Sequence, residues 1–194
     1  MTRTEVGPFG VIGEDETDCA AIRVLIKRMV GEKTRVERRY GNGCAEIYRK
    51  ASAWMHELAK AGCTHVIVLH DLDRDPRNGQ LKDERALRTR LEALAVPRGI
   101  ARLVCIPIEE LEAWFWSDPH VLQQIARRPV DASLNPHTIP KPKEKLMALS
   151  RSAAGAARYS TADNKDLAKT LDLALCAARC PAFRSLARFI GASL

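Results

Sequence analysis

The sequence has few of the motifs by which enzymes are usually recognised. It contains no Walker A loop, no GxGxxG loop and no Ser, His and Asp in a catalytic order, which disfavours an ATPase or a dehydrogenase. Its six cysteines form no CxxC pair and show no Cys/His spacing typical of zinc ligands. Cys176 and Cys180 lie one helical turn apart among apolar residues, which favours small core side chains over a functional pair. The chemistry is therefore to be sought in other residue types.

Long apolar runs are also missing. No segment approaches the roughly 20 apolar residues that a membrane-spanning helix needs, and no signal-peptide pattern opens the sequence. We therefore expect a cytoplasmic protein with reduced thiols and no membrane partner. Hydrophobic residues make up 46% of the 194 residues and charged residues 28%, values that are ordinary for a protein with a folded core.

Basic residues outnumber acidic ones. The chain has 31 Lys and Arg against 24 Asp and Glu, a formal net charge of +7, although some segments are locally acidic. A basic surface around an acidic pocket suits a polyanion such as nucleic acid held near a divalent cation. Because many basic proteins bind no nucleic acid, an ordinary basic surface is the alternative. The charge balance thus makes nucleic acid a candidate partner.

Strand patterns alternate with helical periodicity in the first part of the chain. This alternation predicts an α/β fold with a mostly parallel four-stranded sheet flanked by helices, as in Rossmann-like proteins. The segment 34–40 is mostly polar and is therefore expected at a sheet edge, and Thr17 or Asp18 is the expected N-cap of the first helix. The expected strands are residues 7–13, 34–40, 65–70 and 101–107, and the expected helices are residues 19–29, 45–61 and 81–94.

No strand pattern follows residue 120. Helical periodicity covers residues 119–127, 143–150, 163–178 and 181–191, and a Pro-rich connection covers residues 129–142. We therefore expect an α/β domain over residues 1–120 and an α-helical C-terminal extension over residues 121–194 that packs on it. A further helix is expected to begin directly after the fourth strand, at residue 108.

Three acidic clusters each follow a predicted strand. Because the carboxyl ends of parallel strands meet at one edge of a sheet, these side chains are expected to converge. Carboxylate oxygens are the ligands that Mg²⁺ and Mn²⁺ prefer, and the alternative is that the acids form turns and cap helices. Three clusters at one edge favour a metal site. They are Glu14, Glu16 and Asp18, then Asp71, Asp73 and Asp75, and then Glu109, Glu110 and Glu112.

Two of these segments resemble the Toprim domain shared by topoisomerases, bacterial primases and OLD-type nucleases. Its signature is a Glu after the first strand and a DxD motif after the third. Residues 11–18 (VIGEDETD) and 65–73 (HVIVLHDLD) are similar to it, with Glu14 at the Glu position and Asp71 and Asp73 at the DxD positions. The Toprim Glu is usually followed by Gly, whereas this chain has Asp15.

A wider resemblance covers most of the chain. Residues 106–114 (IPIEELEAW), with the segments 142–146 and 183–184, resemble small bacterial Toprim-like proteins related to OLD nucleases. The resemblance implies a Toprim-like fold and metal-dependent phosphodiester chemistry. It implies catalytic roles for Glu14, Asp71 and Asp73, and metal binding by Glu14, Asp71, Asp73, Glu112 and Glu109.

Other residues are candidates for phosphate contact. Lys141 and Lys143 lie on the Pro-rich connection and Arg74 follows the DxD motif, so each is a candidate phosphate ligand, with ordinary surface cations as the alternative. His70 is either a proton relay or a packing residue. Trp114 and Trp116 either stack on bases or belong to the core, and the apolar helix around them favours the core.

The leading hypothesis is a Mg²⁺- or Mn²⁺-dependent nuclease or phosphodiesterase that acts with a partner protein in antiphage defence or DNA maintenance. Water is the expected nucleophile, because Tyr40, Tyr48 and Tyr159 lie in no recognisable context. The Asp15 departure motivates an alternative, a non-catalytic subunit that contacts a partner ATPase or nucleic acid. A third hypothesis is hydrolysis of a nucleotide or another small phosphate ester.

Overall fold

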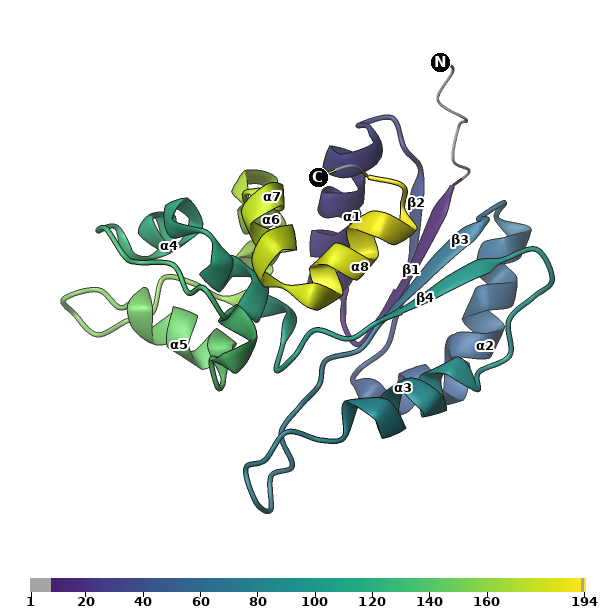
Figure 1. Cartoon of the computed structure of the whole chain (residues 1–194), viewed down its shortest axis with the longest axis horizontal. Coiled ribbons are helices and arrows are strands. Elements are labelled where there is room, and N and C mark those ends of the chain that lie inside the picture. Colours follow the sequence, from purple (N-terminus) through teal and green to yellow (C-terminus); the bar gives the residue numbers. More distant parts are fainter. Residues whose placement is uncertain (1–7, 193) are drawn as a thin grey trace.

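The computed structural model describes residues 8–192 and Leu194, and its centre is a four-stranded parallel sheet with helices against both faces (Figure 1). The strands lie in the order β2-β1-β3-β4, and every neighbouring pair is parallel. The predicted α/β class is thus confirmed. Gly7, at the start of the first predicted strand, lies outside the described residues. The strands are β1 (Phe9–Gly13), β2 (Val36–Tyr40), β3 (His65–Leu69) and β4 (Ala101–Cys105).

The sequence of each strand matches its place in the sheet. All five residues of β1 and the last four of β3 are buried, as expected for central strands covered on both faces. The polar strand β2 lies at the edge, as its composition predicts. Side chains of successive strand residues alternate between two apolar clusters, so Val11 joins the cluster of one face and Ile12 the cluster of the other.

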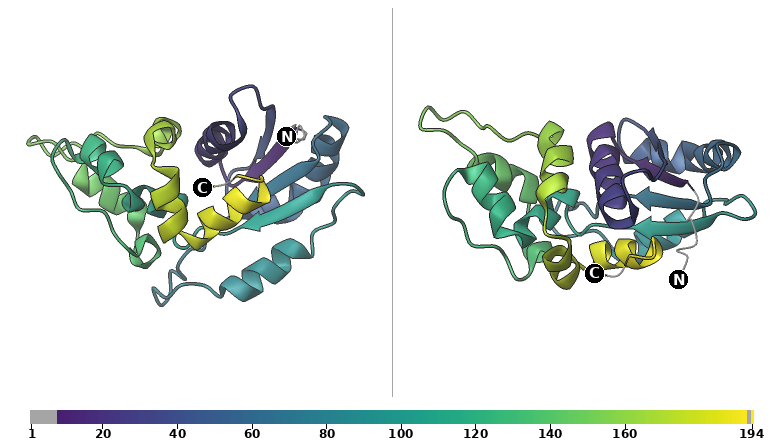
Figure 2. Two further views of the ribbon diagram at one scale, coloured as in Figure 1. Left: turned by 45° about the horizontal axis from the view of Figure 1, so that its top comes forward. Right: turned by 90° about the horizontal axis from the view of Figure 1, so that it is seen from above.

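One helix follows each of the first three strands in the chain. Helix α1 (Glu16–Val30) packs on one face, while α2 (Cys44–Lys60) and α3 (Glu84–Glu92) cover the other, as Figure 2 shows. The predicted N-cap of α1 is wrong. Asp15 caps the helix, because its carboxylate accepts a hydrogen bond from the backbone N–H of Asp18 at 3.0 Å.

The remaining chain forms short helices. They are η1 (Leu111–Ser117) and η2 (Pro136–Thr138), which are 3₁₀ helices, α4 (Pro119–Ala126), α5 (Pro142–Leu149), the 3₁₀ helix η3 (Thr161–Asp163), α6 (Asn164–Thr170), α7 (Leu173–Arg179) and α8 (Pro181–Phe189). The helix expected from residue 108 begins later, at Leu111, because Ile108 still pairs with Leu72 in a parallel bridge. The helix predicted over 163–178 is interrupted, because Leu171 is extended and Asp172 caps a new helix.

The C-terminal helices share the core of the sheet. Arg28 of α1 donates to the carbonyls of Ala168 and Leu171 at 2.8 and 2.7 Å, which fastens α6 to α1. Helix α8 lies against β4, and its Phe183 belongs to the same apolar cluster as Ile22 of α1. The boundary at residue 120 stays a prediction, but apolar residues on both sides of it form one cluster.

None of the helices within the described residues is long and apolar enough to cross a membrane. All six cysteines are free thiols, and five of them are buried.

The shared core gives a first prediction. Phe183 is fully buried and its ring meets that of Trp114 edge-on, with 5.2 Å between the ring centroids. We expect Phe183→Ala to lower the free energy of unfolding by about 3–5 kcal/mol, because it leaves a cavity in the core. Urea unfolding measures this. Leu134→Ala is the control, because Leu134 is 71% exposed and its loss should change stability by less than about 0.5 kcal/mol. Equal effects of the two substitutions would contradict a shared core.

Candidate functional site

The carboxyl ends of β1 and β3 bring Glu14 and Asp71 together. The two strands are direct neighbours in the sheet, and each of these acids follows the end of its strand. The backbone N–H of Asp71 donates to Oε1 of Glu14 at 3.3 Å. The two residues that the Toprim resemblance places at the Glu and first DxD positions are therefore side by side.

Asp71 is the point at which the carboxylates converge. Burial raises the pKa of Asp71 well above its usual value, and the charges of Asp18, Glu112, Glu14 and Glu110 raise it further. Its Oδ1 is inaccessible to solvent and accepts no hydrogen bond from the described residues. The site thus contains a carboxylate without a compensating donor at that oxygen, surrounded by groups of the same charge.

Asp18 joins this cluster from the first turn of α1. It is 7% exposed, and its carboxylate accepts none of the hydrogen bonds found among the described residues. Burial raises the pKa of Asp18 well above its usual value, and the neighbouring carboxylates of Asp15 and Glu112 raise it further. The sequence placed Asp18 in the first acidic cluster but did not single it out as a site residue. Its position in the first turn of the helix that follows β1 and Glu14 was the available signal.

Glu112 is the second buried acid near Asp71, after Asp18. It is 3% exposed, and burial raises its pKa. Its Oε1 accepts hydrogen bonds from Asn164 Nδ2 at 3.1 Å and from the Tyr159 hydroxyl at 3.4 Å. The Tyr159 hydroxyl is also 2.7 Å from Oδ1 of Asn164, which is fully buried. The C-terminal helical part therefore supplies the donors that hold Glu112 in place.

Glu109 and Glu110 are engaged by other partners. Glu109 forms an ion pair with Arg74 and accepts a 3.4 Å hydrogen bond from the Lys141 backbone N–H. Glu110 accepts from the backbone N–H of Lys143 at 3.1 Å and pairs with its Nζ at 3.0 Å. These two acids anchor the start of α5 to the sheet, and the ion pair with Arg74 gives Glu109 a structural role that the sequence did not indicate.

Asp73 lies at the edge of the cluster rather than inside it. Its side chain is 44% exposed and pairs with Lys82 Nζ at 3.1 Å, while its charge raises the pKa of Glu14. It lines an open cleft of about 350 Å³ with cationic and acidic side chains. The other charged lining residues are Arg74, Lys82, Glu109, Glu110 and Lys141.

Two of the three predicted phosphate contacts therefore reach this cleft. Arg74 and Lys141 line it, whereas Lys143 is paired with Glu110. Lys141 Nζ makes none of the ion pairs found among the described residues, while Arg74 is held by Glu109 and by the carbonyl of Gly79 at 2.7 Å. Lys82 was not predicted, because only the folded chain brings it beside Asp73.

His70 connects the cluster to α2. It is 3% exposed, with Nε2 3.0 Å from the Tyr48 hydroxyl and Nδ1 2.8 Å from the Asp71 carbonyl and 3.1 Å from Oε1 of Glu14. Burial raises the pKa of Glu14, and His70 lowers it. The guanidinium of Arg90 lies over the Tyr48 ring at 3.5 Å. His70 therefore holds Glu14 beside Asp71, while Trp114, at 2% exposure, is a core residue.

Among the described residues, no three or more Asp, Glu, His or Cys side chains are already arranged to hold one metal ion. The acids share a site, but their oxygens do not yet surround a common point. Metal binding by Glu14, Asp71, Asp73, Glu112 and Glu109 stays a prediction.

The fold and the site define a Rossmann-like α/β protein with buried acids where its central strands end. Residues 13–190 match the family described as "Domain of unknown function (DUF4276)", and because this covers nearly the whole chain, the chain belongs to that family. No curated protein and no solved structure matches it. The family description names no activity, so the Toprim resemblance stays a prediction.

The raised pKa of Asp71 predicts a pH-dependent change in stability. A carboxyl whose pKa folding raises above its usual 3.8 holds its proton more tightly in the folded state, so stability is lost as pH rises from that value through the raised one. Every tenfold tightening of proton binding corresponds to about 1.4 kcal/mol. With EDTA present, we expect Asp71→Asn to have a higher Tm than the wild type at about pH 8, and a smaller advantage at about pH 5. Thermal unfolding at both values measures this.

The matched control is Asp166→Asn. Asp166 is exposed and pairs with Lys169 on α6, so its replacement should leave Tm nearly unchanged at both pH values. A lower Tm for Asp71→Asn than for the wild type at the higher pH would contradict the raised pKa of Asp71, because it would show that the folded chain stabilises the charged carboxylate.

Proposed function

We propose that this chain is a Mg²⁺- or Mn²⁺-dependent phosphodiesterase that hydrolyses nucleic acid. The observation that supports this most directly is the Asp71 carboxylate. One of its oxygens is buried without a hydrogen-bond donor among the described residues, and the charges of four other carboxylates act on it. A divalent cation would remove both unfavourable features, because carboxylate oxygens are its preferred ligands.

The acids present fit such a cation by their chemistry. Glu14, Asp18, Asp71 and Glu112 would hold it, after their side chains rotate from the present conformations to a common point. Asp71 is the strongest candidate, because its Oδ1 is buried without a hydrogen-bond donor among the described residues. Asp18 comes next, because it is 7% exposed and its carboxylate accepts none of the hydrogen bonds found among those residues. When bound, the cation supplies charge stabilisation for the phosphate oxygens during phosphodiester hydrolysis.

The cleft beside the acids supports a phosphate chain as the substrate. Lys141 and Lys82 line the same cleft as Asp73, and lysine ammonium groups bind phosphate as point charges. Arg74 pairs with Glu109 and donates to the Gly79 carbonyl, and these contacts hold its side chain in the wall of the cleft. The substrate would thus bind with its backbone along Lys82 and Lys141 and with one phosphate toward Asp71.

Water is the proposed nucleophile. The Tyr159 hydroxyl is engaged by Asn164 and the Tyr48 hydroxyl by His70, so both are committed to structural contacts. Glu14 is partly exposed at the site and is held by His70 and the Asp71 amide, a position suited to accept a proton from water.

We also propose a cellular role, a partner and a location for this chain. The Toprim resemblance favours a role in antiphage defence or DNA maintenance, with an ATPase as the partner. The free, mostly buried thiols agree with a cytoplasmic location.

Cleavage assays test the proposal. The purified chain is incubated with labelled single-stranded DNA, double-stranded DNA and RNA, each with Mg²⁺, Mn²⁺ or EDTA. We expect cleavage of at least one substrate that depends on the cation, and a loss of about 100-fold or more in Asp71→Asn, because a ligand to the cation is removed. Lys141→Ala should weaken substrate binding and its salt dependence with less effect on the rate at saturation.

Asp166→Asn is again the control and should cleave as the wild type does. A thermal shift with Mn²⁺ gives a second readout, which should be present in the wild type and reduced in Asp71→Asn. Cleavage that persists in Asp71→Asn would contradict the proposed site. A Mn²⁺ shift without cleavage of any nucleic acid would favour the non-catalytic subunit, and a screen of small phosphate esters would separate the third hypothesis.

A further inference from the structure

The net positive charge of this chain lies in its C-terminal helical part. Residues 121–194 contain 12 of the 31 Lys and Arg but only 5 of the 24 Asp and Glu, so they carry the whole formal charge of +7. The first 120 residues are therefore neutral on balance. Such an uneven distribution gives one part of the molecule a positive field that attracts a partner of negative charge.

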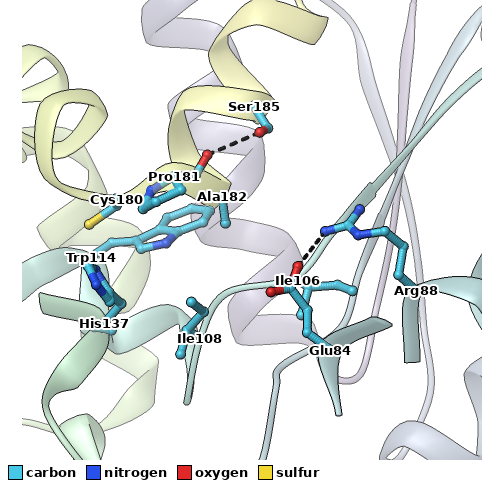
Figure 3. Close-up of a pocket in the computed structure, with 11 residues that line it drawn as sticks. Glu84, Arg88, Ile106, Ile108, Trp114, His137, Cys180, Pro181, Ala182 and Ser185 are labelled. Carbon is cyan, nitrogen blue, oxygen red and sulfur yellow. Dashed lines mark hydrogen bonds and ion pairs between the residues drawn. The ribbon is translucent and has the colours of Figure 1, made fainter. Parts of the chain in front are cut away.

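The two parts also differ in how their cations are paired. Nine Lys and Arg side chains before residue 121 form ion pairs within the described residues. Arg88 is an example, because it lines a cavity of about 130 Å³ beside β4 and its Nη2 donates to Oε1 of Glu84 at 2.9 Å (Figure 3). After residue 120, only Lys143 and Lys169 are paired with acids in the described part of the chain. The helical part thus holds cations whose charge the protein itself does not neutralise.

Two of these cations are brought together in the loop between α5 and η3. We call residues 150–159 the arginine loop. Ser150 is buried and closes the base of this loop, because its Oγ accepts from the backbone N–H groups of Arg158 and Tyr159, each at 3.1 Å. Arg151 follows Ser150 directly, so Arg151 and Arg158 lie at the same end of the loop. Both are exposed, and the loop contains no acidic residue.

The arginine loop is fixed to the acidic cluster through its last residue. The Tyr159 hydroxyl is 3.4 Å from Oε1 of Glu112 and 2.7 Å from Oδ1 of Asn164. Lys165 follows Asn164, is exposed, and makes none of the ion pairs found among the described residues. The contacts that hold Glu112 therefore also place unpaired cations beside the acidic site.

The lysines of α5 extend this basic surface to the cleft. Lys141 precedes the first residue of α5, is exposed, and lines the cleft together with Asp73. Lys145 lies one helical turn further along and is also exposed, and its backbone N–H donates to the Lys141 carbonyl at 3.1 Å. Helix α5 ends at Leu149, directly before the arginine loop. Cations thus follow one another from the cleft along α5 to the arginine loop.

This surface lacks the side chains that bind unpaired bases. Proteins that bind single strands stack successive bases on aromatic rings. The helical part has only three Phe, Tyr or Trp residues, of which Tyr159 and Phe183 are buried and Phe189 packs against the core. Arg and Lys bind phosphate groups instead, and a duplex displays phosphates on its outside while its bases are stacked inside. The surface therefore fits a duplex better than a single strand.

We propose that the arginine loop and α5 bind the phosphate backbone of a double-stranded nucleic acid. Duplex DNA and duplex RNA both present this chemistry. As a statement about the substrate of the acidic site, this proposal rests on the proposed function. The binding itself requires no catalysis.

Fluorescence anisotropy of the full chain tests the proposal. A labelled DNA duplex, an RNA duplex of the same length and an oligothymidine of the same length are titrated with the protein in EDTA. We expect at least one duplex to bind with a Kd at least about tenfold lower than that of the oligothymidine. EDTA prevents cation-dependent cleavage, so an inactive acidic site leaves this measurement unaffected.

A double substitution locates the binding. Arg151→Ala combined with Arg158→Ala removes two proposed phosphate contacts. We expect it to weaken duplex binding by about tenfold or more, and to reduce the slope of log Kd against log salt concentration by about 2.

The matched control is Lys33→Ala combined with Arg98→Ala. It changes the net charge equally, and both residues are exposed and make none of the ion pairs found among the described residues. They precede β2 and β4, so they lie at the ends of the strands opposite the acids. This control should bind the duplex as the wild type does. Unchanged circular dichroism shows that both variants are folded.

Each outcome supports or overturns the proposal. Equal Kd values for the duplexes and the oligothymidine overturn it, as does equal loss of affinity in the arginine variant and its control. Displacement of the duplex by polyglutamate as readily as by unlabelled duplex also overturns it, because the surface would then fit an acidic protein. Tighter binding of either duplex, lost only in the arginine variant, supports it and identifies DNA or RNA. Such binding without cleavage in Mg²⁺ or Mn²⁺ would contradict the proposed function and leave this proposal intact.

Discussion

The main constraint on this structure is the repulsion between carboxylates that the parallel sheet brings close together. Parallel strands place Glu14 and Asp71 at one sheet edge, and α1 and η1 add Asp18 and Glu112. The chain compensates Glu112 with Asn164 and Tyr159, and it compensates Glu109 and Glu110 with Arg74, Lys141 and Lys143. It leaves Asp18 and one oxygen of Asp71 without donors among the described residues. Acids that have donors or cations beside them stabilise the fold, whereas the acids without such partners among the described residues are the candidates to bind a divalent cation.

The same contacts explain how the two halves of the chain are joined. The glutamates after β4 are bound by residues of α5, of α6 and of the segment before α6. Arg28 adds a link from α1 to α6, and Phe183 extends the core onto α8. Polar and apolar contacts thus both hold the C-terminal helices against the sheet. An intact acidic site requires the helical part, although that part supplies none of the four candidate ligands Glu14, Asp18, Asp71 and Glu112.

Local patterns predicted part of this arrangement. Apolar runs predicted β1, β3 and β4, the mostly polar segment 34–40 predicted β2 at the sheet edge, and neighbouring strand ends predicted the pair Glu14 and Asp71. The N-cap at Asp15, the break at Leu171 and the Arg74–Glu109 pair were not predictable. The N-cap depends on a choice between several neighbouring acceptor side chains, and the other two depend on partners far apart in the chain. The cavity beside β4 could not be predicted either, because its lining comes from several separate segments.

The distance in sequence between Glu112 and its donors has a consequence for biosynthesis. Glu112 accepts its closest hydrogen bond from Asn164, 52 residues later in the chain. A nascent chain that has already completed β4 still has Glu112 without this donor, and α1 without the helix that Arg28 binds. Because synthesis runs from the N-terminus, all four strands are made before Asn164, and Glu112 can gain this donor only after residue 164 has been added to the chain. A truncation that keeps the whole sheet but ends before Asn164 would therefore retain the acids around Asp71 and lose the group that holds Glu112 among them.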